Sequence, residues 1–143
     1  MRHFRFLPLC VLVALAGCTT GGPALTPVTG TVTLDDKPLA GALVKFFPQG
    51  NTEGHGGFAK TGEDGKYEIA PQRLSGKGLL PGEYKVIVSR LLTPDGKPLP
   101  PDAKPIETAA IESVPEPYCR LNLTPLKVTV GATPVTLDIP LTK

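Results

Sequence analysis

Apolar and polar residues alternate with a period of two along several short stretches of the chain. In the stretch VTGTVTL, for example, Val28, Val32 and Leu34 share one face with Gly30, while threonines occupy the other face. Successive side chains of a β-strand point to opposite faces, so this alternation predicts a strand with one buried face. The same pattern predicts further strands within residues 42–48, 79–89, 126–130 and 134–140.

Turn-forming residues separate these stretches. Residues 58–70, FAKTGEDGKYEIA, are predicted to form a β-hairpin that turns near Asp64, with Tyr67 and Ile69 facing inward. The segment GAT, residues 131–133, is predicted to join the last two strands as a second hairpin. No segment sustains a helical apolar stripe. The pattern therefore predicts an all-β fold, a single small antiparallel β-sandwich of about seven strands.

Residues 91–117 interrupt this rhythm because they contain seven prolines in 27 residues. Proline removes backbone hydrogen-bond donors and stiffens extended backbone. Two interpretations remain open for this segment. It is a semi-rigid excursion that crosses one sheet edge and protects it from aggregation, or it is a long loop with a function of its own.

The N-terminus has the parts of an export signal. Arg2 and Arg5 give a basic start, and residues 6–16 form an apolar run that is too short to span a membrane, since a spanning helix needs roughly 20 residues. The run ends in LAGC, which resembles the lipobox of bacterial lipoproteins. That resemblance implies a cleaved signal peptide, residues 1–17, and an acylated cysteine, Cys18, as the first mature residue. Ordinary secretion with a free thiol is the alternative.

Residues 18–27 lack apolar periodicity and are predicted to tether the lipid to a domain formed by residues 28–143. The lipoprotein resemblance implies two or three acyl chains, and two are enough for stable membrane anchoring. Thr19 stands where an aspartate retains many lipoproteins at the inner membrane. The resemblance thus implies an exported protein of the cell envelope, held at the outer membrane rather than the inner one.

Processing also changes the charge and the cysteine count. Removing Arg2 and Arg5 leaves 13 basic residues against 13 acidic ones, so no net positive charge remains to attract nucleic acid, and a nucleic-acid partner is not expected. Cys10 leaves with the signal and Cys18 is acylated, which leaves Cys119 without a disulfide partner. Cys119 is predicted to be a small buried apolar residue.

The chain offers no pattern typical of catalysis or metal binding. His55, the only histidine of the mature chain, stands among glycines and is predicted to be a solvated loop residue. Acidic residues in loops lack the alternating spacing of a calcium site and are explained by turn formation. These acidic residues are Asp35, Asp36, Glu63, Asp64 and Asp95. We expect no catalytic residue, no metal ligand, no cofactor and no enzymatic activity.

Gly82 and Tyr84 have a structural interpretation. Gly82 is predicted to permit a tight start to a strand, and Tyr84 to bury its ring while its hydroxyl bonds to nearby backbone, as tyrosine corners do. On this strand Val86 and Val88 share the inward face with Tyr84, and Ile87 is an apolar exception on the outward face.

Several motifs occur in an order that resembles a known family. They are VTGTVTLDDKPLAGALVKFFP, TGEDGKYEI, LLPGEYKVIVS and the ending ESVPEPYCRLNLTPLKVTVGATPVTLDI. Together, over residues 27–140, they resemble the carboxypeptidase regulatory-like domain found in small lipoproteins of the planctomycete type. The resemblance implies a transthyretin-like, immunoglobulin-like sandwich. It implies no chemistry, because such domains accompany carboxypeptidases and transporters without their active sites.

Two functions follow as expectations. The first is a membrane-anchored, non-catalytic envelope lipoprotein whose β-sandwich is a structural or protein-interaction module. The second is a carbohydrate or small-ligand binding module that uses the loops at residues 48–57 and 91–117. Sugar sites usually present exposed aromatic rings, and the aromatic residues near these loops are Phe47, Phe58 and Tyr118. The sequence names no ligand for either function.

Overall fold

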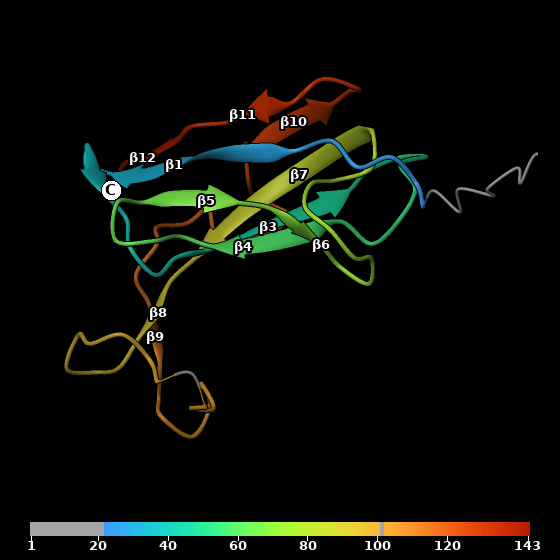
Figure 1. Ribbon diagram of the computed structural model, residues 1–143. Coiled ribbons are helices and arrows are strands. Elements are labelled where there is room, and N and C mark those ends of the chain that lie inside the picture. Colours follow the sequence, from blue (N-terminus) through green and yellow to red (C-terminus); the bar gives the residue numbers. More distant parts are fainter. Residues whose placement is uncertain (1–21, 101) are drawn as a thin grey trace, which may run out of the picture.

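The computed structural model describes residues 22–100 and 102–143, which form strands joined by turns and loops (Figure 1). This part of the chain contains no helix, and therefore none that is long and apolar enough to cross a membrane. The prediction of an all-β fold is confirmed. The strands are β1 (Val28–Leu34), β2 (Lys37–Pro38), β3 (Leu43–Pro48), β4 (Gly57–Lys60), β5 (Lys66–Glu68), β6 (Ala70–Pro71), β7 (Gly82–Ser89), β8 (Leu91–Leu92), β9 (Ile111–Glu112), β10 (Lys127–Val130), β11 (Val135–Thr136) and β12 (Ile139–Leu141).

The first sheet is built around β1. On one side β11 and β12 pair with β1 in parallel, with Val28 opposite Val135 and Val32 opposite Ile139. On the other side β2 and β5 pair with β1 in antiparallel orientation. The sheet is therefore mixed, and the prediction of antiparallel pairing is wrong for β1 and the C-terminal strands. Alternation of apolar residues specifies which face is buried but not the direction of the neighbouring strand.

The second sheet has the strand order β10–β7–β3–β4–β6, with antiparallel pairing throughout. Its central strand pair places Val44 opposite Val88 and Phe46 opposite Val86. All four side chains are buried on the inward face. Ile87 faces outward and is half-buried, as the alternation predicts.

The hydrophobic core joins the inward faces of the two sheets. The ring of Phe46 on β3 links them, since its centroid lies 6.4 Å from that of Tyr67 on β5 and 6.3 Å from that of Tyr84 on β7. Aromatic pairs at such distances add packing energy to the burial of apolar area. The other buried apolar residues are Val28, Val32, Leu39, Ala42, Val44, Ala59, Ile69, Leu79, Val86, Val88, Val114, Val130, Ile139 and Leu141.

The two predicted hairpins are instead connections between the sheets. A turn does form near Asp64, where the Gly62 N–H donates to the Lys66 carbonyl oxygen at 2.9 Å. The strands that flank it separate, however, because β4 pairs with β3 and β6 while β5 pairs with β1. Likewise β10 pairs with β7 and β11 pairs with β1, so residues 131–134 cross from one sheet to the other. A short turn segment does not by itself reveal whether its strands pair.

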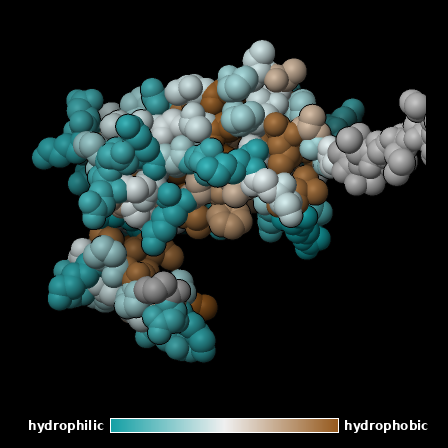
Figure 2. Space-filling view, viewed as in Figure 1, coloured by the Kyte–Doolittle hydropathy of each residue, from teal (hydrophilic) through white to brown (hydrophobic). Residues whose placement is uncertain are grey.

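The proline-rich segment forms an arm. β8 and β9 pair with each other as a separate two-stranded sheet, and the arm extends away from the two larger sheets instead of crossing an edge (Figure 1). Its most exposed apolar side chain, Ile106, is 95% exposed. Apolar surface gathers where the arm joins the body of the molecule (Figure 2). The arm itself covers no sheet edge, but the chain that returns from it runs beside the end of β7, where the Ser113 N–H donates to the Arg90 carbonyl oxygen at 2.9 Å and the Val88 N–H donates to the Tyr118 carbonyl oxygen at 3.0 Å.

Tyr84→Phe is expected to destabilise the protein by about 1 kcal/mol, because it removes a hydrogen bond from a buried site. Tyr84 is 2% exposed, and its hydroxyl donates to the Leu80 carbonyl oxygen at 2.8 Å, as the tyrosine-corner interpretation predicts. Thermal unfolding followed by circular dichroism measures the effect as a lower Tm. An unchanged Tm would show that the bond contributes nothing net to stability.

Candidate functional site

The residues that the sequence singles out for chemistry lie apart from one another. Cys18 lies outside the described residues. His55 is exposed in the loop between β3 and β4, as predicted. Cys119 is half-buried and packs against the core, and burial is the main cause that raises the pKa of its thiol. A thiol with a raised pKa is mostly protonated near neutral pH, and a protonated thiol is a poor nucleophile.

The acidic loop residues shape turns. An Asp64 carboxylate oxygen accepts from the Lys66 N–H at 3.1 Å, and Asp35 and Asp36 adopt positive φ angles of 49° and 63° between β1 and β2. The Thr93 hydroxyl donates to Asp95, and this bond is the main cause that lowers the pKa of Asp95. Among residues 22–100 and 102–143, no three His, Cys, Asp or Glu side chains gather as a metal site would require.

A different surface brings charged and apolar side chains together, namely the outward face of the second sheet, here called the outer face. Four lysines cross it from strand to strand: Lys127 on β10, Lys85 on β7, Lys45 on β3 and Lys60 on β4. Lys127 lies directly opposite Lys85 in the ladder, and the other two follow at successive diagonal positions. These four residues form a diagonal line that we call the lysine stripe.

Apolar side chains border the lysine stripe on both sides. On one side Phe47 lies opposite Lys85 and Phe58 lies opposite Lys45. On the other side Ile87 lies opposite Lys45, and Leu43 lies opposite Lys60. Phe58 is 49% exposed, while Phe47, Ile87 and Leu43 are half-buried. Each lysine of the two central strands therefore has an apolar side chain directly beside it on a neighbouring strand.

Two hollows on the outer face lie beside the predicted ligand loops, and a third, of about 370 Å³, lies at Lys127, Lys85 and Glu83. One of about 430 Å³ is lined by Lys45, Phe47, Phe58 and His55, among others, where the predicted ligand loop at residues 48–57 meets the face. The other, of about 260 Å³, lies at the base of the arm and includes Leu43, Lys60, Ser89 and arm prolines. The two loops that the sequence predicts to bind ligand thus border the same face at different places.

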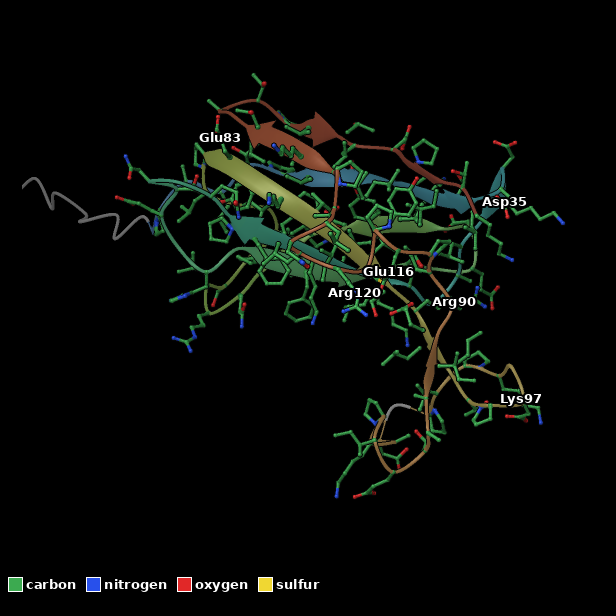
Figure 3. The ribbon with its side chains drawn as sticks, turned by 180° about the vertical axis from the view of Figure 1, so that it is seen from behind. Asp35, Glu83, Arg90, Lys97, Glu116 and Arg120 are labelled. Carbon is green, nitrogen blue, oxygen red and sulfur yellow. The ribbon has the colours of Figure 1, made fainter. Side chains whose placement is uncertain are left out.

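The loop beside the larger hollow is fixed to β7. The Glu83 N–H donates to the Thr52 hydroxyl at 2.8 Å, and the Gln49 N–H donates to the Glu83 carbonyl oxygen at 2.9 Å. Gly82 makes this approach possible, since a Cβ there would lie 2.3 Å from a Thr52 carbon, in agreement with the predicted tight start of the strand. Glu83 and Arg90 mark the two ends of β7 in Figure 3.

The four stripe lysines share one face and have no carboxylate partner among the described residues, as is also true of the scattered residues Lys37, Arg73, Arg90 and Lys143. Elsewhere five basic side chains have carboxylate partners: Lys66–Asp64, Lys77–Glu68, Lys97–Asp95, Lys104–Glu107 and Arg120–Glu116. Within residues 22–100 and 102–143, no carboxylate lies within 4.0 Å of a stripe lysine. Like charges directly opposite each other in a sheet are destabilising, as at Lys127 and Lys85.

Sequence reasoning missed the lysine stripe. The formal charge of the mature chain is zero, and its lysines are far apart in the sequence, so no basic stretch is visible. The two-residue alternation of their strands does predict that Lys45 and Lys85 face outward, and this was the available signal for a basic face. Only strand register turns these isolated positions into a line.

No family model matches the chain, and neither a curated protein nor a solved structure is significantly similar to it.

Proposed function

We propose that the protein is a membrane-anchored, non-catalytic lipoprotein of the cell envelope whose domain is a transthyretin-like β-sandwich that acts as an interaction module. The lipobox resemblance of LAGC supports cleavage after residue 17 and acylation of Cys18. The identity of Thr19 supports the outer membrane in preference to the inner one. The order of carboxypeptidase regulatory-like motifs supports the sandwich type.

The outer face is the observation that carries the interaction role. It presents four lysines without carboxylate partners among the described residues, bordered by phenylalanine and aliphatic side chains. Such side chains bind by charge and by apolar contact. Exposed apolar area together with unneutralised charge is typical of a surface that contacts a partner.

Ligand binding is the second candidate, and the larger hollow favours it. Phe47, Phe58 and His55 line this hollow together with Lys45, and the sequence had associated both phenylalanines with the loop at residues 48–57. Rings beside a cation suit a ligand that has an apolar surface and a negative charge.

Mass spectrometry of the N-terminal peptide from membrane fractions tests the anchor. We expect the mature chain to begin at an acylated Cys18, and Cys18→Ala to move the protein from the membrane fraction to the soluble fraction, because the acyl chains supply the membrane affinity. Thr19→Ser is the matched control and is expected to leave fractionation unchanged. An unmodified Cys18, or retention of residues 1–17, would contradict the anchor.

Photo-crosslinking in intact cells tests the interaction role. A photoreactive amino acid at Phe58 is expected to give a reproducible adduct, because this side chain is half-exposed on the outer face, directly opposite Lys45 of the stripe. The same amino acid at Asp36, an exposed turn residue between β1 and β2, is the control. Equal adducts at both positions, or none at either, would count against the outer face as the contact surface.

A further inference from the structure

We propose that the lysine stripe binds a linear polysaccharide that carries carboxylate groups. This inference rests on the proposed function, because an envelope location brings the domain next to polysaccharide. The requirement for a negative partner comes from the stripe itself, since Lys45, Lys60, Lys85 and Lys127 have no carboxylate within 4.0 Å among the described residues. Glu83, beside Lys85 on the same strand face, is the one carboxylate that strands β3, β4, β7 and β10 place on the outer face.

The dimensions of the stripe suit an extended polymer. It crosses four neighbouring strands and advances by four residues along the strand direction between Lys127 and Lys60. With about 4.8 Å between strands and about 3.3 Å per residue along a strand, its length is roughly 20 Å. Several repeat units of an acidic chain fit along this length, each within reach of a flexible lysine side chain.

The borders of the stripe suit sugar rings. A pyranose ring has apolar C–H faces and a polar rim, and Phe47 and Phe58 present rings on one side of the lysines. Ile87 and Leu43 give an aliphatic surface on the other side. A carboxylated sugar laid along the stripe would thus place its charge on the lysines and its apolar faces on these side chains.

A peptide or a membrane fits this face less well. The backbone groups of β3 and β7 are used in the ladder, so an extended acidic peptide that crossed the strands would find no backbone partners and would pair at a sheet edge instead. A membrane favours protruding apolar side chains. On the outer face Phe47, Ile87 and Leu43 are half-buried and Phe58 is 49% exposed, whereas the most exposed apolar residue, Ile106, lies on the arm.

Isothermal titration calorimetry with polygalacturonate, a uronic-acid homopolymer, tests the proposal. The full chain is purified in non-ionic detergent, and dextran of similar length is the neutral comparison. We expect polygalacturonate to bind, dextran not to bind, and the affinity to fall as NaCl rises from about 0.05 to about 0.5 M, because salt screens charge pairs. The double substitution Lys45→Glu and Lys85→Glu is expected to weaken binding at least tenfold, that is, by about 1.4 kcal/mol or more.

Matched variants test whether a loss of binding comes from the charge change, from its position on the stripe or from loss of folding. Lys66→Glu with Lys97→Glu makes the same charge change away from the stripe and is expected to retain binding, as is Lys45→Arg with Lys85→Arg. The Tm of every variant confirms that it is folded. Phe58→Ala is expected to weaken binding several-fold through lost ring contact.

Other anionic probes show whether the polysaccharide assignment is wrong. Tighter binding to anionic lipid vesicles, poly-glutamate or oligo-thymidylate than to polygalacturonate would overturn the polysaccharide assignment, while leaving the outer face as an interaction surface. No binding to polygalacturonate, or equal binding by the Lys45→Glu, Lys85→Glu variant, would overturn the inference itself. The proposed function fails separately, through an unmodified Cys18 or a silent photo-crosslink at Phe58.

Discussion

Gly30→Ala is expected to destabilise the protein by about 3 kcal/mol or more, a large fraction of the stability of a domain of this size. The Cβ of an alanine at this position would lie 1.8 Å from the carbonyl oxygen of Leu137 and 2.9 Å from the Tyr67 hydroxyl. The nearest atom belongs to the backbone, so no change of rotamer relieves the overlap. β1 and its neighbours would have to move apart.

The contact above Gly30 ties three chain segments together. The Tyr67 hydroxyl of β5 passes over β1 and donates to the Leu137 carbonyl oxygen at 2.6 Å, between β11 and β12. Burial, with a smaller contribution from Asp138, raises the pKa of Tyr67, so the phenol keeps the proton that this bond requires throughout the physiological range. Any side chain at position 30 would separate this donor from its acceptor.

Denaturant unfolding of Gly30→Ala beside Gly131→Ala measures the effect. A Cβ at Gly131 would meet no atom within 4 Å, so this control is expected to change the unfolding free energy by less than about 0.5 kcal/mol. Tyr67→Phe added to Gly30→Ala is expected to give no rescue, because the Leu137 oxygen remains in place. A stability of Gly30→Ala equal to that of Gly131→Ala would refute the close approach at β1.

The two-residue alternation of apolar and polar residues predicts the strands well, but it does not predict which distant strands pair with each other. The inward faces of β1, β3 and β7 follow from alternation alone, because burial of one face is a local consequence of strand geometry. The parallel pairing of Val28 with Val135 joins residues more than 100 positions apart, and no local signal encodes it. For the same reason Tyr84, whose partner Leu80 is four residues away, was predicted correctly, whereas the bond from Tyr67 to Leu137 was not.

The candidate site was predictable only in part. The glycine-rich loop at residues 48–57 is visible in the sequence as a possible ligand-binding element, and Phe47 and Phe58 as aromatic residues near it, but the sequence identifies no ligand-binding residue. The lysine stripe was not, since it depends on the registers of three strand pairs at once. The net charge of the mature chain is zero because acidic residues elsewhere balance the stripe lysines, so the net charge does not reveal that one face is positive.

Glu112→Ala is expected to loosen the base of the arm by about 2 kcal/mol, which is a thirtyfold increase in the population of the opened state. One carboxylate oxygen accepts from the Arg90 N–H at 2.8 Å and from the Val114 N–H at 2.9 Å, and the other accepts from the Ser89 hydroxyl at 2.5 Å. Alanine would leave all three donors without this acceptor. The charge on Glu112 strengthens these bonds beyond those of a neutral acceptor.

Limited trypsin digestion reports this opening, because Arg90 lies where β7 ends and the arm begins (Figure 3). Cleavage after Arg90 is expected to accelerate about thirtyfold in Glu112→Ala, while cleavage after Arg73, in the exposed loop between β6 and β7, keeps its wild-type rate. Glu112→Gln is the informative control. Its amide oxygen can still accept from the Arg90 and Val114 N–H groups, so the base of the arm is expected to open far less in this variant than in Glu112→Ala. The difference between wild type and Glu112→Gln then measures the contribution of the charge.

If Glu112→Gln and Glu112→Ala gave equal cleavage rates, charge and not hydrogen-bond geometry would hold the arm. If neither changed the rate, the Ser113 contacts to the Arg90 carbonyl oxygen would be sufficient to hold it.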